Sequence, residues 1–303
     1  MGNNLVEKIQ QLKKEKNAVI LAHYYVDGAI QAIADFVGDS FYLAKVAKQV
    51  KEDTIVFCGV SFMGESAKIL NPNKKVLMPD ATADCPMAHM VEDGLIDKIR
   101  SEYPDVAVVC YVNSVIGLKC QSDVCVTSSN AVKIVKAMPN KNIFFIPDEN
   151  LGRHVKEQVP EKNVILNKGF CPKHKAMTAE QVLEVKAEHK NALVLAHPEC
   201  TEKVLALADY IGSTEGIISY AKQSDAKEFI ICTEVGVLYR LEQDSPDKKF
   251  YFVNPKPICD DMKKITLEKI AHVLETGENE VIISEEDRLK AIKPLDKMLE
   301  LAK

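Results

Sequence analysis

Short apolar runs alternate with amphipathic, charged segments along the whole chain of 303 residues. A short run without polar alternation is typical of a strand buried on both faces of a parallel sheet. Longer segments with apolar residues three and four positions apart predict helices between such strands. The expected strands are 18–22, 35–38, 54–57, 75–78, 106–111, 124–127, 143–146, 164–166, 193–196, 210–212, 229–232 and 250–253. This alternation predicts an α/β protein with parallel sheets.

The pattern occurs three times, and the copies share chemistry-bearing residues at fixed spacings. His23, Tyr111 and His197 end the first apolar run of each copy and serve as anchors for counting. An aspartate follows 12 residues after each anchor, a hydroxyl residue 17 after it, and a cysteine 45, 43 or 45 residues after the hydroxyl. In chain order these residues are Asp35, Asp123 and Asp209, then Ser40, Ser128 and Thr214, then Cys85, Cys171 and Cys259. Self-similarity at a fixed period indicates a repeat architecture.

Three homologous αβα units, related by a pseudo-threefold axis, can bring these residues to one central active site. The expected units are 1–87, 88–173 and 174–303, the last with a C-terminal helical segment. Helices rich in charge are expected near 4–16, 91–103, 178–190 and 266–275. Ligands of parallel sheets bind beyond the carboxyl ends of the strands, where the anchors and the three repeat cysteines lie.

The cysteines fall into two groups by their surroundings in the sequence. Nine cysteines without a C-x-x-C pair indicate thiols or metal ligands rather than disulfides. The strand-like runs contain four that we interpret as small buried residues: Cys58, Cys110, Cys125 and Cys232. Cys120 and Cys125 flank a strand, so we predict no metal site there. Cys200 follows Glu199 and has no partner in the other repeats, so its role stays open.

The three repeat cysteines stand instead in polar loops that read DCPM, FCPKH and PICDD. Three thiolates with no matching fourth ligand indicate a zinc site with an open position, or an iron–sulfur cluster with one iron lacking a protein ligand. His89 and His174 lie near two of the cysteines and could complete a zinc site. They have no counterpart near Cys259, so the sequence favours this alternative less.

The repeated hydroxyl residues Ser40, Ser128 and Thr214 precede helical segments, and we expect each to be an N-cap. Helix N-termini that face a cleft bind anions, and Ser213 adds a fourth hydroxyl. The repeated aspartates are interpreted as structural turn residues between helix and strand.

Polar side chains recur at the ends of the first strands. Two residues after each anchor stand Tyr25, Asn113 and Glu199. Glu199 and the two histidine anchors can transfer protons. Asn113 and Tyr111 are suited to positioning and hydrogen bonding.

Charge and composition exclude several classes of protein. A net charge of −5 and a pI near 5.9 give no polybasic signature, so nucleic acid is not expected as a partner. No apolar run approaches the length of a membrane span, and the start shows no apolar signal-peptide region. We therefore expect a cytoplasmic protein without a membrane partner.

Specific motifs spread over almost the whole length add a family resemblance. They read LAHYY, ADFVGDS, DCPMA, YVNS, VTSSNAV, GFCPKH, AHPEC, IGSTEGI, TEVG and MKKITLE. In this combination the chain resembles the quinolinate synthase family of NAD biosynthesis. The resemblance implies three similar α/β units and an oxygen-sensitive [4Fe–4S] cluster, held by Cys85, Cys171 and Cys259.

The resemblance also implies an activity and site residues. The activity would be condensation of iminoaspartate with dihydroxyacetone phosphate to quinolinate, with release of phosphate and water and with the cluster as Lewis acid. Transient contact with an enzyme that produces iminoaspartate is compatible with it. Tyr25 would be a catalytic tyrosine, with Glu199, His23 and His197 as further proton-transfer groups. Substrate-binding positions would be His23, Ser40, Tyr111, Asn113, Ser128, His197, Glu199 and Thr214, to which the residue pattern adds Ser213.

Two rival hypotheses stay open at this point. The first is another cluster-dependent dehydratase that acts on a hydroxy acid. The second is a non-enzymatic scaffold whose cysteines hold structural zinc, which a colourless anaerobic preparation would favour.

Overall fold

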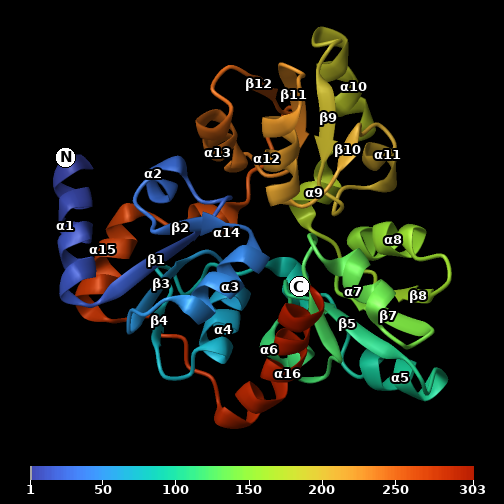
Figure 1. Cartoon of the computed structure of the whole chain (residues 1–303), viewed down its shortest axis with the longest axis horizontal. Coiled ribbons are helices and arrows are strands. Elements are labelled where there is room, and N and C mark those ends of the chain that lie inside the picture. Colours follow the sequence, from blue (N-terminus) through green and yellow to red (C-terminus); the bar gives the residue numbers. More distant parts are fainter. Residues whose placement is uncertain (1) are drawn as a thin grey trace. The chain divides into compact units, whose positions relative to one another are not determined.

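A computed structural model describes residues 2–303, and it contains three four-stranded parallel sheets (Figure 1). The strand orders are β2-β1-β3-β4, β6-β5-β7-β8 and β10-β9-β11-β12. In each sheet the first strand of the repeat lies between the second and the third. The predicted α/β class and the threefold repetition of the αβα pattern are confirmed.

The strands begin and end close to the predicted positions. Those of the first sheet are β1 (Ala18–His23), β2 (Phe36–Gly38), β3 (Thr54–Cys58) and β4 (Lys75–Leu77). Those of the second are β5 (Ala107–Tyr111), β6 (Val124–Val126), β7 (Asn142–Ile146) and β8 (Asn163–Leu166). Those of the third are β9 (Leu193–Ala196), β10 (Tyr210–Ile211), β11 (Glu228–Cys232) and β12 (Lys249–Tyr251). Every residue of β1, β3 and β5 is buried, as expected for strands covered on both faces.

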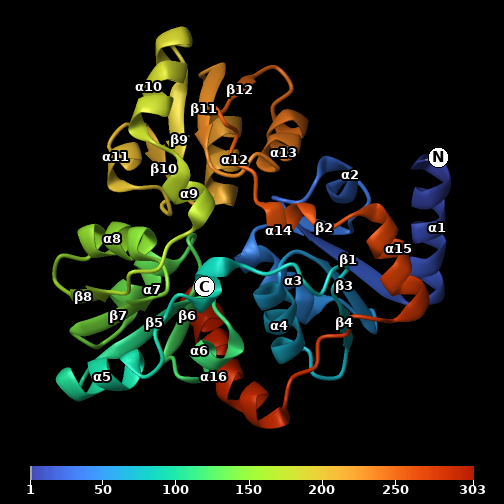
Figure 2. The same cartoon turned by 180° about the vertical axis from the view of Figure 1, so that it is seen from behind.

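The chain divides into two compact units, residues 2–85 with 259–292, and residues 86–258 with 293–303. The first unit contains the first sheet; its helices are α1 (Gly2–Glu15), α2 (Gly28–Gln31), α3 (Ser40–Gln49), α4 (Ser61–Leu70), α14 (Asp260–Lys263) and α15 (Leu267–Thr276). Helices α1 and α15, far apart in sequence, lie side by side in both views (Figures 1 and 2). A Lys8–Glu275 ion pair of 2.6 Å joins them.

The second unit contains the other two sheets. The helices around the second sheet are η1 (Pro86–His89), α5 (Leu95–Glu102), α6 (Ile116–Cys120), α7 (Ala131–Ala137) and α8 (Glu149–Gln158). Those of the third repeat are α9 (Pro172–Ala176), α10 (Ala179–Glu188), α11 (Glu202–Leu205), α12 (Thr214–Gln223) and α13 (Val237–Asp244). Helix α16 (Glu285–Leu301) ends the chain and contributes residues to both units. The predicted division into residues 1–87, 88–173 and 174–303 stays a prediction.

Each repeated aspartate joins its strand to the first strand of the same sheet. The Asp35 carboxylate accepts a hydrogen bond from the Ile20 backbone N–H at 2.8 Å, while the Asp35 N–H donates to the Ile20 carbonyl at 3.0 Å. The same reciprocal pair links Asp123 with Val108 and Asp209 with Val194. The predicted structural role of these residues is confirmed, and the recurrence shows that the three copies share local geometry.

Candidate active site

The three anchors occupy equivalent ends of the central strands. His23 ends β1, Tyr111 ends β5, and His197 directly follows β9. All three side chains are buried. In the first and third repeats the residue two positions on donates its backbone N–H to the anchor ring: Tyr25 to His23 Nδ1 at 3.2 Å, and Glu199 to His197 Nδ1 at 3.3 Å. A ring whose Nδ1 accepts carries its proton on Nε2 when neutral, so both histidines present an Nε2–H donor.

A hydrogen bond connects the second and third repeats at their strand ends. The Tyr111 hydroxyl donates to Glu199 Oε1 at 2.7 Å, and both side chains are buried. Nearby in sequence, Asn113 Oδ1 is buried without a hydrogen-bond partner among the described residues. A buried acceptor left unpaired has a free-energy cost, so a ligand that donates a proton there would be favoured.

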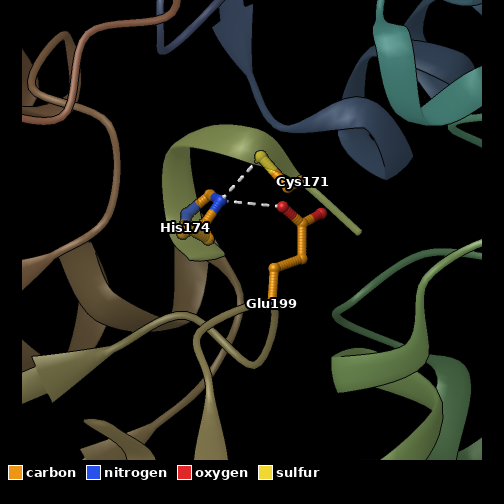
Figure 3. Close-up of side chains that lie close together, drawn as sticks. All are labelled: Cys171, His174 and Glu199. Atoms are coloured by element: carbon orange, nitrogen blue, oxygen red, sulfur yellow. Dashed lines mark hydrogen bonds and ion pairs between the residues drawn. The ribbon is translucent and has the colours of Figure 1, made fainter. Parts of the chain in front are cut away.

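His174 lies at the centre of this site (Figure 3). Its Nδ1 is 2.8 Å from Glu199 Oε2 and 3.1 Å from Cys171 Sγ, while its Nε2 is 2.9 Å from Thr233 Oγ1. The position follows from the sequence Cys-Pro-Lys-His, because Cys171 is the N-cap of α9 and His174 lies in its first turn. One imidazole therefore contacts both an expected metal ligand and an expected catalytic carboxylate.

The pKa values of two buried carboxyl groups of this site are shifted in opposite directions. Burial opposes ionisation of Glu199, but the charges of His174 and His197 and hydrogen bonds from His174 and Tyr111 outweigh it and lower its pKa to about 2. Burial, together with the negative charge of Glu199, raises the pKa of Asp148 well above its usual value. Glu199 is thus an anion at neutral pH. Asp148 Oδ2 accepts from the Cys171 backbone N–H at 3.1 Å and helps to fix that loop.

Tyr25 lies in a loop that α14 holds in place. Lys263 Nζ donates to the Tyr25 carbonyl at 2.7 Å and forms an ion pair with Asp27 at 3.2 Å. The backbone N–H of Lys263 donates to the carbonyl of Cys259, the N-cap of α14. The Tyr25 ring meets the His23 ring edge to face, with centroids 4.5 Å apart. A single helical turn therefore connects Cys259 with the tyrosine loop.

The prediction that Ser40, Ser128 and Thr214 are N-caps was wrong. Asp39 caps α3 by accepting from the Tyr42 N–H at 2.9 Å, and Ser213 caps α12 by accepting from the Gly216 N–H at 3.1 Å. In each case the preceding residue has the extended backbone that a cap requires, so the hydroxyl residue becomes the first helical residue.

Ser128 lies outside its helix for a different reason. Asn130 Oδ1 accepts from the Thr127 N–H at 2.7 Å and closes a turn over these residues. Helix α7 therefore begins only at Ala131, with Asn130 at the cap position. Ser128 is half-buried in that turn.

The cysteines differ in burial, and those of the strand-like runs are buried as the sequence analysis predicted. The four strand cysteines are fully buried: Cys58, Cys110, Cys125 and Cys232. Cys85, Cys171 and Cys259 are half-buried, and each directly precedes a short helix, namely η1, α9 and α14. Cys200 is buried, and its thiol donates to the Cys232 carbonyl at 3.3 Å. None of the nine cysteines forms a disulfide.

Sequence reasoning missed three residues that organise the site and gave a fourth only a minor place. It considered His174 only as a less favoured zinc ligand, and it passed over Asp148, Thr233 and Lys263. The spacing Cys-x-x-His at a helix start is the one signal that could have placed His174 beside Cys171. The other three act through contacts distant in sequence, which no local pattern shows.

An α/β chain with buried acid–base groups and half-buried thiols beyond its strand ends has the arrangement of an enzyme. The profile of the family described as Quinolinate synthetase A protein matches residues 7–300. The chain belongs to this family. Similarity over its full length gives it quinolinate synthase function in NAD biosynthesis.

Curated relatives support this membership. The quinolinate synthase of Fusobacterium nucleatum is 54% identical over 296 residues, covering 98% of this chain and 99% of that protein. The quinolinate synthase of Caldicellulosiruptor saccharolyticus is 54% identical over 295 residues, covering 97% of each chain. That of Clostridioides difficile is 50% identical over 302 residues, covering 100% of this chain and 99% of the other. Among residues 2–303, no helix is long and apolar enough to cross a membrane.

Proposed function

We propose that the chain condenses iminoaspartate with dihydroxyacetone phosphate to quinolinate, with release of phosphate and water. We further propose that Cys85, Cys171 and Cys259 hold a [4Fe–4S] cluster. The observation that carries the proposal is the repeated placement of these three half-buried thiols, each directly before a short helix, against the full burial of the strand cysteines.

The residues present fit such a cluster. The Cys171 backbone N–H donates to Asp148, and that of Cys85 donates to Asp84 Oδ1 at 2.8 Å, so both loops are fixed by neighbouring carboxylates. Three protein thiolates would leave one iron open, and that iron would supply Lewis-acid chemistry when the cluster is bound. The family resemblance and the donor set both support this assignment.

The chain itself would bind and orient the anionic substrates. Ser40 and Thr214 are the first residues of α3 and α12, where the positive end of the helix dipole favours negative charge. Ser213 and Asp39 complete these helix starts, and Asn113 offers its unpaired oxygen to a donor on the ligand. Ser128 presents its hydroxyl from the turn before α7.

Proton transfer would be divided among the strand-end residues. His23 and His197 each present an Nε2–H, because their Nδ1 atoms accept backbone hydrogen bonds. Glu199, held as an anion by two histidines and a tyrosine despite its burial, would stabilise positive charge that develops on His174 or His197. Tyr25 would transfer a proton as the catalytic tyrosine, while Tyr111 would only donate a hydrogen bond. These roles, and delivery of iminoaspartate by transient contact with a producing enzyme, stay predictions.

The test is anaerobic purification of the full chain, followed by iron and sulfide analysis and an assay with both substrates. We expect four irons and four sulfides per chain, a brown colour, and quinolinate only when both substrates are present. A colourless preparation that takes up no iron and sulfide on reconstitution would refute the cluster. A loaded protein that forms quinolinate without dihydroxyacetone phosphate would refute the reaction.

A further inference from the structure

Cys171, His174 and Glu199 form a compact group of metal-binding atoms within the second unit (Figure 3). The thiol sulfur, the ring nitrogen and the carboxylate oxygen all lie within 4.8 Å of one another. His174 and Glu199 are only 2% and 3% exposed, so these are not surface groups that merely happen to be close. Buried polar groups that converge on one point are costly unless they are paired or hold a ligand.

The donor set matches zinc. Tetrahedral Zn²⁺ is bound by thiolate, imidazole and carboxylate at about 2.0–2.3 Å, which separates the ligand atoms by about 3.3–3.8 Å. The distances of 2.8 and 3.1 Å from His174 Nδ1 to Glu199 and Cys171 would need to widen by less than about 1 Å. One thiolate, one carboxylate and a neutral imidazole also cancel the charge of a divalent ion, which lowers the cost of burying it.

The groups that would orient such ligands are already in place. The outer nitrogen of His174 is 2.9 Å from Thr233 Oγ1, as expected for a histidine that binds metal through Nδ1 and donates from Nε2. Glu199 directs Oε2 at His174 while Tyr111 bonds its Oε1. Asp148 accepts from the Cys171 N–H. Each ligand is therefore held by an outer partner that does not compete for the metal.

We propose that the chain without its iron–sulfur cluster binds one Zn²⁺ through Cys171 Sγ, His174 Nδ1 and Glu199 Oε2, and that bound zinc keeps Cys171 from the cluster. The fourth position would hold water. On binding, the Cys171 thiol proton passes to solvent, His174 donates its Nδ1 lone pair, and the ring proton resides on Nε2. The zinc site does not depend on the proposed reaction; only the competition depends on the cluster assignment.

The first experiment measures zinc affinity of the full chain, prepared reduced and without iron, by competition with a chromophoric chelator. We expect one Zn²⁺ per chain. Cys171→Ser and His174→Gln should each weaken binding by more than about 100-fold, and Thr233→Val by about 10-fold. Glu199→Gln keeps an acceptor for Tyr111, so it tests the ligand with little risk to folding, and it should weaken zinc at least 10-fold.

Matched controls separate this site from the alternatives. Cys85→Ser should leave zinc affinity within about twofold, as should His272→Gln, which changes an exposed histidine of α15. A loss in Cys85→Ser equal to that in Cys171→Ser would mean that several repeat thiolates hold the ion, and would overturn the proposal. Unchanged affinity in Glu199→Gln or His174→Gln, with normal melting temperatures, would overturn it as well.

Co²⁺ provides a direct view of the ligands. The cobalt-loaded chain should show a thiolate-to-metal absorption band in the near ultraviolet that disappears in Cys171→Ser and persists in Cys85→Ser. For the competition, one equivalent of Zn²⁺ added before reconstitution should block iron and sulfide uptake, and a chelator should restore it. Full uptake in the presence of tightly bound zinc would refute the competition while leaving the zinc site and the reaction intact.

Discussion

Cysteines inside the sheets and cysteines in the loops beyond the carboxyl ends of the strands lie in different surroundings. Inside the sheets, Cys58 and Cys232 fill space: burial alone raises the pKa of Cys58 strongly and that of Cys232 to about 12, so these two thiols stay neutral and are poor ligands. In the loops, Cys85, Cys171 and Cys259 are half-buried and directly precede short helices, and carboxyl groups accept from the backbone N–H of the first two. Sheet residues should therefore determine stability, and loop residues chemistry.

The largest expected effect follows from replacing a loop cysteine. Single Cys85→Ser, Cys171→Ser or Cys259→Ser variants should lose nearly all cluster iron, because each removes one of three thiolates. The matched sheet variant Cys232→Ser should keep full iron and sulfide content per folded chain. Iron analysis after anaerobic reconstitution checks this, and full iron in any loop variant would break the contrast between the two regions.

Loss of a proton-handling group should have the next largest effect. Tyr25→Phe removes one hydroxyl, and Glu199→Gln removes the charge beside His174. We expect both to retain the cluster and to lower kcat by roughly 100-fold or more, the usual scale for acid–base groups. The measurement is anaerobic steady-state kinetics at matched iron content. If KM rises instead while kcat is preserved, the residue only binds substrate.

A sheet aspartate should affect stability without affecting chemistry. Asp209→Ala removes the carboxylate bond to the Val194 N–H and should lower the free energy of unfolding by about 1.5 kcal/mol. Asp209→Asn keeps an acceptor and should cost much less. Thermal melts report the difference, while kcat per loaded chain should stay within about twofold. A large fall in kcat would show that the sheet body also tunes the site.

The smallest expected effect distinguishes the two residues at the start of α3. Asp39→Ala removes the cap and should cost about 1 kcal/mol of stability. Ser40→Ala should leave the melting temperature almost unchanged but weaken binding of a dicarboxylate product analogue. Melts and analogue titrations on the same two variants check this. A reversed pattern, with Ser40 controlling stability, would contradict the observed cap.

The fold was predictable because its signals are local. A run such as Thr54–Cys58 shows its buried strand in five consecutive residues, and the counting from His23, Tyr111 and His197 showed the repeats. Cap positions were less predictable, since Asp39-Ser40 and Ser213-Thr214 each contain two competent caps, and only backbone geometry selects the first.

The sequence predicted which residues belong to the candidate site, but not the hydrogen bonds and ion pairs that connect them. The loop cysteines and strand-end residues recur, so counting found them. Lys263 reaches the Tyr25 carbonyl across 238 residues, and His174 reaches Thr233 across 59. Such contacts depend on tertiary packing between distant segments, which a single sequence does not show.

In two of the three repeats, the backbone N–H two residues after the anchor donates a hydrogen bond to the anchor ring. This difference decides which copy depends on another. His23 and His197 keep the ring nitrogen that accepts it, so each copy fixes its own side chain. Tyr111 has no such nitrogen, and a neighbouring copy fixes it through Glu199. The second copy therefore depends on the third for this contact at its anchor. The second copy cut out alone would lose the Glu199 bond to its anchor, whereas the first and third copies would keep the bonds that hold their own anchors.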